Sequence, residues 1–193
     1  MKKPITAKEL AYVGVFTAIM AVFSQISIPL PFTPVPITLS LFAVYLTSTM
    51  LPMRSALLTQ VAYILLGAVG VPVFANFRSG LTALAGPTGG YIFSYVLMAA
   101  AIAGLSPRID ASSKLPFGGV GRSAAYGGAY LIATAICYTF GTLWLMAFRQ
   151  ASFAQTFALA VAPFLPLDAL KIAACAAIAP KLRKASLARA AGA

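Results

Sequence analysis

The chain contains no histidine and very little acidic charge. Its 193 residues include only three acidic side chains, and only 9% of the residues are charged. Without histidine, histidine-based metal sites, histidine-ligated haem and the commonest general base are excluded. Soluble domains carry about a quarter charged residues, so this chain lacks the polar surface needed to cover a water-facing globule.

Cysteine is almost as scarce. Cys137 and Cys175 lie far apart, each inside an apolar run, and they form neither a CxxC motif nor a disulfide framework. We expect both thiols to be packing residues. With so few nucleophiles, bases and acids, we expect no catalytic residues, no metal and no cofactor, and we do not expect an enzyme.

What the chain has in abundance is hydrophobic residues, which make up 61% of it. The apolar runs are continuous rather than alternating, which argues against a membrane β-barrel. A membrane-spanning helix needs roughly 20 apolar residues, so the length accommodates about six. We therefore predict an all-α polytopic membrane protein, a single transmembrane domain over residues 1–193, whose first apolar run is retained as a span. The six predicted helices cover residues 10–28, 37–51, 55–71, 90–105, 123–148 and 166–180.

The net charge of +11 is distributed between and beyond the apolar runs. We attribute it to membrane topology and contact with anionic lipid headgroups, not to nucleic acid. Both termini are predicted to be cytoplasmic in a multi-pass protein of the cell membrane. Arg78 and Arg149 then lie outside and Lys171 lies near the membrane. Eleven basic residues lie inside: Lys2, Lys3, Lys8, Arg54, Arg108, Lys114, Arg122, Lys181, Arg183, Lys184 and Arg189.

Three predicted outer loops have unusual compositions. Residues 29–36 read PLPFTPVP, whose four prolines predict a stiff, extended lid. Residues 71–90 are aromatic at the start and glycine-rich at the end, and we expect them to fold back over the helices. Residues 149–165 are largely apolar, which is compatible with a short helix.

Two helices are expected to begin at the outer face with residues that could bind a ligand. Glycines of the segment 86–91 precede the fourth helix, while Asp168 and Lys171 begin the sixth. Helix N-termini favour anions, and transporters aim them at anionic substrate groups. Asp168 and Lys171 are three residues apart and share a helix face. They form either a structural ion pair or, as we favour, a site for a ligand with polar and anionic groups.

Other residues of the second outer loop leave two interpretations open. The glycines of 86–91 either form a tight turn or let a ligand approach the backbone closely. They do not form a Walker A loop, because the Gly-Lys-Ser/Thr ending is missing, so we expect no ATP hydrolysis by this chain. Phe74, Phe77 and Tyr91 either stack on a ligand or anchor the chain at the membrane surface. Arg78 meets either a carboxylate or a lipid phosphate.

The first predicted helix carries a stripe of small residues, Ala7, Ala11, Gly14 and Ala18. Small residues on one face allow another helix to approach closely in a membrane. The stripe serves either internal packing or docking of a different subunit, and spacing alone does not separate these alternatives.

Several segments closely resemble the BioY family, the biotin-specific S components of energy-coupling-factor transporters. They are GVPVFA at 70–75, GPTGGY at 86–91, PVPIT at 34–38, and the pair Asp168-x-x-Lys171. The resemblance covers nearly the whole chain. Ser40 stands where the family has glutamine, and Asn76 and Ser79 stand in a loop that is richer in glycine in the family.

The resemblance implies a six-helix protein that binds biotin at the outer face, beneath the first two outer loops. It implies a passive subunit powered by two cytoplasmic ATPases through a membrane coupling subunit, and it favours subunit docking for the stripe of small residues. An S component for another vitamin, or a solitary biotin transporter, is the alternative. The expected ligand-binding residues are Thr38, Phe74, Asn76, Phe77, Arg78, Thr88, Gly89, Gly90, Tyr91, Asp168 and Lys171.

Overall fold

The structure is a computed structural model that describes residues 5–112 and 119–191, with side chains as far as residue 188. Lys2, Lys3 and Lys114, which the sequence places inside, lie outside the described residues, and so does the side chain of Arg189.

A helix occupies each of the six predicted ranges. These helices are α1 (Ala7–Gln25), α2 (Ser40–Met50), α3 (Met53–Ala68), α5 (Gly89–Ala111), α6 (Gly119–Arg149) and α8 (Leu165–Ala191). Three shorter helical segments lie in the predicted outer loops: η1 (Ala75–Phe77), α4 (Gly80–Ala85) and α7 (Phe153–Ala160). The short helix expected in residues 149–165 is therefore confirmed as α7, and the second outer loop is partly helical.

Not every helix is long enough to cross a bilayer alone. Among the described residues, α1, α5 and α6 are long and apolar enough, and α7 with α8 makes a fourth candidate if that pair, bent by 55°, counts as one span. α2 has 11 residues, about 17 Å at 1.5 Å per residue, against a hydrocarbon core of about 30 Å. The structure thus has several membrane-crossing helices, and the total of six spans stays a prediction.

The prediction of an entirely helical chain missed a small β-hairpin. β1 (Ser27–Ile28) pairs antiparallel with β2 (Ile37–Thr38), in the register Ser27–Thr38 and Ile28–Ile37. The proline-rich residues 29–36 form the loop of this hairpin and contain no helix, as predicted, because proline lacks the N–H that a helix interior requires. The two-residue strands hold both ends of the loop together.

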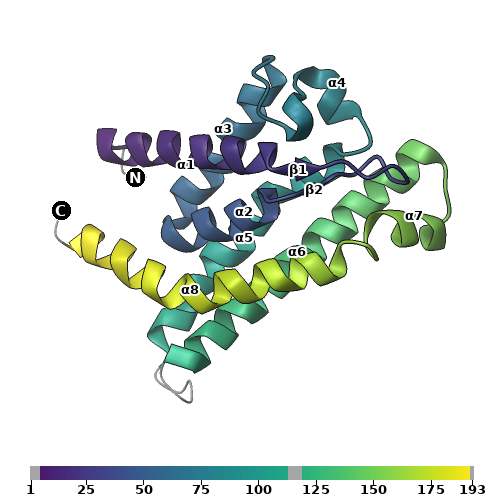
Figure 1. The fold of residues 1–193 in the computed structure, drawn as a ribbon. Coiled ribbons are helices and arrows are strands. Elements are labelled where there is room, and N and C mark those ends of the chain that lie inside the picture. The colour runs from purple at the N-terminus through teal and green to yellow at the C-terminus, as the bar shows by residue number, and fades with distance from the viewer. Residues whose placement is uncertain (1–4, 113–118, 192–193) are drawn as a thin grey trace.

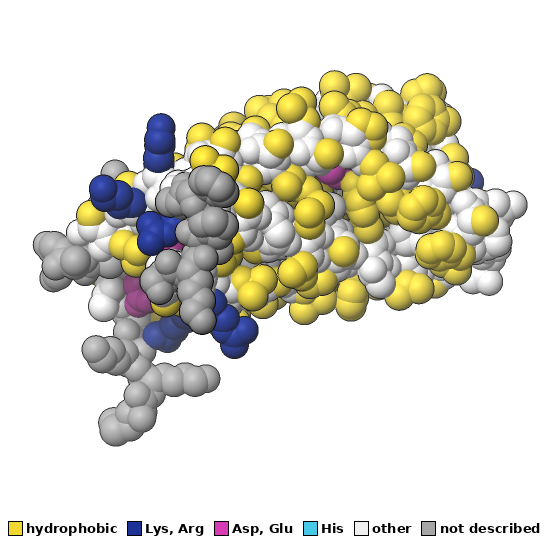
Figure 2. All heavy atoms as spheres, turned by 90° about the horizontal axis from the view of Figure 1, so that it is seen from below, with side chains coloured by type: hydrophobic (Ala, Val, Ile, Leu, Met, Phe, Trp, Pro, Cys, Tyr) yellow, Lys and Arg dark blue, Asp and Glu magenta, His cyan; other side chains and the backbone are white. Residues whose placement is uncertain are grey.

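The elements are arranged so that the molecule has two distinct ends. Figure 1 shows the described ends of the chain near N and C on one side, and the hairpin, α4 and α7 toward the opposite side. Figure 2 shows Lys and Arg side chains gathered at the end that carries the termini, with a largely apolar surface between the two ends. Hydrophobic side chains such as Leu10, Val22, Leu131 and Leu143 are exposed, as expected where lipid is the solvent.

The core between the helices is aromatic and hydroxyl-rich. Tyr45 and Tyr130 stack with ring centroids 4.8 Å apart, and both are fully buried. Their hydroxyls contact Thr134 and Thr49, respectively. Such pairing satisfies polar groups that neither lipid nor water can reach.

Candidate ligand-binding site

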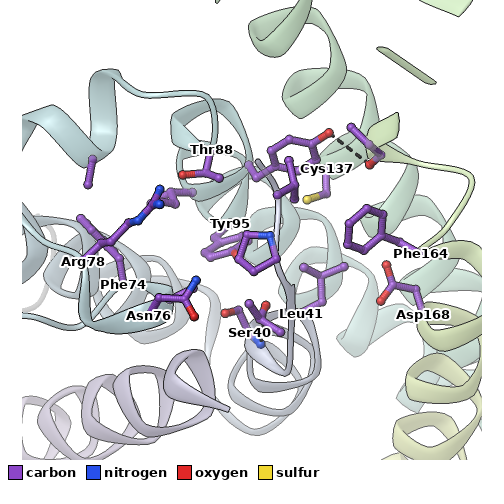
Figure 3. Close-up of a pocket in the computed structure, with 18 of the residues that line it drawn as sticks. Ser40, Leu41, Phe74, Asn76, Arg78, Thr88, Tyr95, Cys137, Phe164 and Asp168 are labelled. Carbon is purple, nitrogen blue, oxygen red and sulfur yellow. Dashed lines mark hydrogen bonds between the residues drawn. The ribbon is translucent and has the colours of Figure 1, made fainter. Parts of the chain in front are cut away.

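A cavity of about 70 Å³ lies beneath the outer loops, at the end opposite the chain termini. Its walls come from the hairpin, α2, α3, the second outer loop with α4, the start of α5, α6, the end of α7 and the start of α8. Figure 3 shows Arg78 and Asn76 on one side of the cavity and Asp168 on the other, with Ser40, Leu41 and Tyr95 between them. The two helix starts that the sequence singled out therefore meet at one pocket.

The acid and the amine at the start of α8 form a buried ion pair. The Nζ atom of Lys171 lies 2.7 Å from Oδ1 of Asp168 and donates a second hydrogen bond to the carbonyl of Thr38, at 2.6 Å. The hydroxyl of Tyr138 donates to the other carboxylate oxygen, Oδ2. Asp168 is 4% exposed and Lys171 9% exposed. The cavity wall thus offers a donor and an acceptor fixed in place by their neighbours.

Asp168 lies in the first turn of α8, where the helix dipole stabilises a negative charge. Burying a charge is expensive, and pairing it with its opposite within hydrogen-bonding distance reduces that cost. An apolar pair would avoid the cost altogether. The retention of a buried pair on a cavity wall is therefore characteristic of a functional site in a membrane protein.

Gln25, at the end of α1, fastens the second outer loop over the cavity. Its amide nitrogen donates to the carbonyls of Pro72 and Phe74, each at 3.1 Å, and its Oε1 accepts from the backbone N–H of Phe77 at 2.9 Å. Asn76 adopts the left-handed conformation, at φ 58°, and its Oδ1 accepts from the hydroxyl of Ser27 at 2.9 Å. The loop is thereby joined to both α1 and the hairpin.

The glycines at the start of α5 serve helix packing. A Cβ atom on Gly90 would lie 2.3 Å from Cβ of Trp144, and one on Gly89 would lie 1.8 Å from the carbonyl oxygen of Leu84. The indole N–H of Trp144 also donates to the carbonyl of Gly86 at 2.9 Å. Close approach of backbones, rather than direct exposure to the cavity, explains Gly89 and Gly90.

The expected site residues divide into two groups. Neither Gly89, Gly90 nor Phe77 is among the cavity-lining residues in the described part of the chain, and Phe77 is 70% exposed. The others do line the cavity: Thr38, Phe74, Asn76, Arg78, Thr88, Tyr91, Asp168 and Lys171.

Sequence reasoning missed several lining residues, of which Tyr138 is the most important. Tyr95, Phe164 and Ala160 also contribute to the wall, and the hydroxyl of Tyr91 donates to the carbonyl of Ala160 at 3.3 Å. A tyrosine in the middle of an apolar run needs a hydrogen-bond partner when buried. That rule predicts that the hydroxyl of Tyr138 forms a hydrogen bond, but it does not identify Asp168 as the partner.

The stripe of small residues on α1 faces outward. Ala7, Ala11, Gly14 and Ala18 are all exposed, and a Cβ placed on Gly14 would meet no atom within 4 Å. Internal packing within the described chain is therefore not the role of this stripe.

Among the residues that the structure describes, no group of three or more His, Cys, Asp or Glu side chains is placed so that it could hold a metal ion.

Comparison with known proteins gives a consistent result. The chain is 34% identical over 182 residues to the biotin transporter BioY of Thermotoga maritima, covering 94% of this chain and 99% of that protein. It is 36% identical over 177 residues to the probable biotin transporter BioY of Pyrococcus horikoshii, covering 92% and 97%. The crystal structure of the S-component for biotin from an ECF-type ABC transporter superimposes with a TM-score of 0.80 at 22% identity, covering 95% of both chains, and this likeness shows the fold. Since residues 1–188 match the BioY family, the chain belongs to that family.

Proposed function

We propose that this chain is the biotin-binding membrane subunit of an energy-coupling-factor importer and not an enzyme. It captures biotin at the outer face and delivers it inward, and the whole chain acts as one substrate-binding domain in the cell membrane. The observation that carries the proposal is the cavity in which the Asp168–Lys171 pair faces Asn76 and Arg78. Family membership and the similarity to a biotin transporter and a probable biotin transporter support biotin as the ligand.

The wall chemistry suggests how biotin is oriented. Biotin has a carboxylate at one end and a ureido group, with donors and an acceptor, at the other. Lys171 and Asp168 already neutralise each other and offer a donor beside an acceptor, which suits the ureido group. Arg78, a cation across the cavity, suits the carboxylate, because guanidinium and carboxylate form short charge-assisted hydrogen bonds. The aromatic rings of Phe74, Tyr91 and Tyr95 then line the apolar middle.

Biotin entry requires movement of the outer loops. The cavity of about 70 Å³ is small compared with the roughly 300–1,000 Å³ of typical ligand pockets. The wall includes two segments outside the long helices, the proline-rich loop 29–36 and residues 71–88, and such segments move more readily than packed helices. We propose that these segments shift outward to admit the ligand.

The partners follow from the same proposal. A coupling membrane subunit docks on the exposed stripe of α1, and two cytoplasmic ATPases supply energy to it. The alternative is a solitary transporter that needs no such module, and the same cavity is compatible with it. An S component for another vitamin is separated from a biotin subunit by the ligand it prefers.

A calorimetric titration of the purified protein with biotin tests the proposal. We expect binding of biotin in preference to riboflavin or thiamine. Asp168→Asn and Lys171→Met should each weaken it roughly ten- to a hundredfold, because a hydrogen bond to a charged group contributes about 1.5–3 kcal/mol.

Asp110→Asn is the matched control, since Asp110 forms an ion pair with Arg183 at the opposite end of the molecule, with an N–O distance of 2.7 Å. Its effect on biotin affinity should be negligible. Stronger binding of another vitamin, or full affinity in both site variants, would reject the proposal.

A further inference from the structure

A second and larger cavity, of about 560 Å³, lies at the end of the molecule that carries the chain termini. Its walls come from the start of α1, the turn between α2 and α3, and the ends of α5 and α8. Figure 1 shows the N-terminal end of α1 and the C-terminal end of α8 on the same side of the molecule, and residues of both helices line the cavity. It shares no lining residue with the ligand cavity, so the proposed biotin site does not account for it.

The cavity is apolar in its depth and charged at its rim. Phe16, Leu51 and Ala103 lie in the wall and are each less than 10% exposed. Lys8 and Arg183 contribute positive charge from two different helices. This gradient from apolar to cationic matches an amphiphile with a negative head.

Two hydrophobic side chains in the wall remain open to the surroundings. Met53 is 47% exposed and Leu187 46% exposed, and both contribute to the wall of the cavity. At the same place Gly104 contributes no side chain, and a Cβ there would meet no atom within 4 Å. The wall therefore presents apolar surface beside free space of the kind that an acyl chain fills.

The rim can hold an anion despite a nearby carboxylate. Arg183 uses its Nε for Asp110 and one Nη1 donor for the carbonyl of Thr49, which are two of the five donors of a guanidinium. Glu9 also lines the cavity, but its Oε2 accepts from the backbone N–H of Thr6 in a capping box.

The surroundings of the rim are strongly positive. Glu9 and Asp110 are the two acidic side chains at this end, against seven described basic ones. These basic residues are Lys8, Arg54, Arg108, Arg122, Lys181, Arg183 and Lys184.

We propose that this cavity binds an anionic phospholipid from the leaflet at the basic end. An acyl chain lies along the wall formed by Phe16, Met53 and Leu187, and the phosphodiester lies between Lys8 and Arg183. Basic pockets between membrane helices recognise anionic headgroups by this combination of charge and apolar contact.

Native mass spectrometry of the purified protein tests the proposal, with phosphatidylglycerol and phosphatidylcholine added at equal concentrations. We expect phosphatidylglycerol to be retained preferentially. Lys8→Gln should reduce that preference roughly fivefold, the effect of one basic residue near a membrane surface. Gly104→Phe, which fills the open space, should abolish retention of both lipids.

Two controls make the result specific. Lys181→Gln removes an exposed charge of the same end that does not line the cavity, and it should leave the preference unchanged. Biotin affinity should be the same in all three variants, which shows that they are folded.

Four outcomes would overturn the proposal. They are equal retention of the two lipids, an effect of Lys181→Gln as large as that of Lys8→Gln, and displacement of the lipid by glycerol phosphate alone. The fourth is a Gly104→Phe variant that keeps the lipid but loses association with the coupling subunit, which would identify the cavity as a protein-docking site.

Discussion

Gly90 illustrates how a single residue sets the position of the ligand site. It lies at the start of α5, where the backbone runs against Trp144 and the carbonyl of Phe140 on α6. A Cβ at this position would be 2.3 Å from Cβ of Trp144 and 3.0 Å from the oxygen of Phe140. Neither atom is the free end of a flexible side chain, so the helices would have to separate.

We predict that Gly90→Ala lowers the stability of the protein by about 1–3 kcal/mol, the usual effect of overpacking. Thermal unfolding in detergent measures it. Gly104→Ala on the same helix is the control, because its Cβ meets no neighbour and alanine has the higher helix propensity. Equal stability of the two variants would contradict the packing role of Gly90.

At the scale of residues, the sequence predicted the chemistry of the site better than its geometry. The spacing of three placed Asp168 and Lys171 on one helix face, and in the structure they form an ion pair at 2.7 Å. Their role in ligand binding stays a prediction. The contribution of Tyr138 did not follow, because it depends on how α6 is rotated against α8. For the glycines of 86–91 the sequence left a tight turn and close approach of a ligand open, and the structure places Gly89 and Gly90, at the start of α5, against Leu84 and Trp144.

α1 has one buried and one exposed face. Met20 and Ser24 are fully buried against the other helices, while Ala11, Gly14 and Ala18 are exposed. The sequence left open whether the small residues pack internally or meet another subunit. Their exposure supports the second alternative, since small residues let a partner helix come close.

We predict that Gly14→Trp abolishes biotin uptake in cells that contain the complete importer, because the ring would separate the helices at the docking face. Biotin binding to the purified variant should be unchanged, since Gly14 does not line the ligand cavity. Leu131→Trp, at an exposed position of α6, is the matched control and should transport normally. Normal uptake by Gly14→Trp would argue for a solitary transporter or a different docking face.

The secondary structure of the outer loops was predicted only in part from the sequence. The proline content of residues 29–36 correctly excluded a helix, and α7 was anticipated. The hairpin was not, because two-residue strands leave no periodic pattern in a sequence. Its pairing brings Thr38 to a position where its carbonyl accepts from Lys171.

The whole molecule has a basic end and an end that holds the ligand cavity, and this polarity implies an orientation in the membrane. Positive residues favour the cytoplasmic side. The ligand cavity, with α7 beside it, is then on the outer side. The orientation remains a prediction that labelling can decide.

We expect Ala154→Cys on α7 to react with a membrane-impermeant maleimide in intact cells, and Ala185→Cys on α8 to react only after permeabilisation. Both alanines are exposed. The resident thiols Cys137 and Cys175 are fully buried, so the parent protein is a suitable unlabelled control. The reverse labelling pattern would place the ligand cavity on the cytoplasmic side.

The sequence by itself determined the membrane class, the positions of the main helices, the chemistry of the acid–amine pair and the two-ended distribution of charge. These follow from hydropathy, helical spacing and composition, which are local properties of the chain. Only the tertiary structure decided that Lys171 bonds to Thr38, 133 residues away, that Tyr138 holds Asp168, and that an open cavity separates α1 from α8. The physical reason is that contacts between distant segments depend on the rotation and crossing of whole helices, and a hydrophobic pattern does not set either when nearly every face of a helix is apolar.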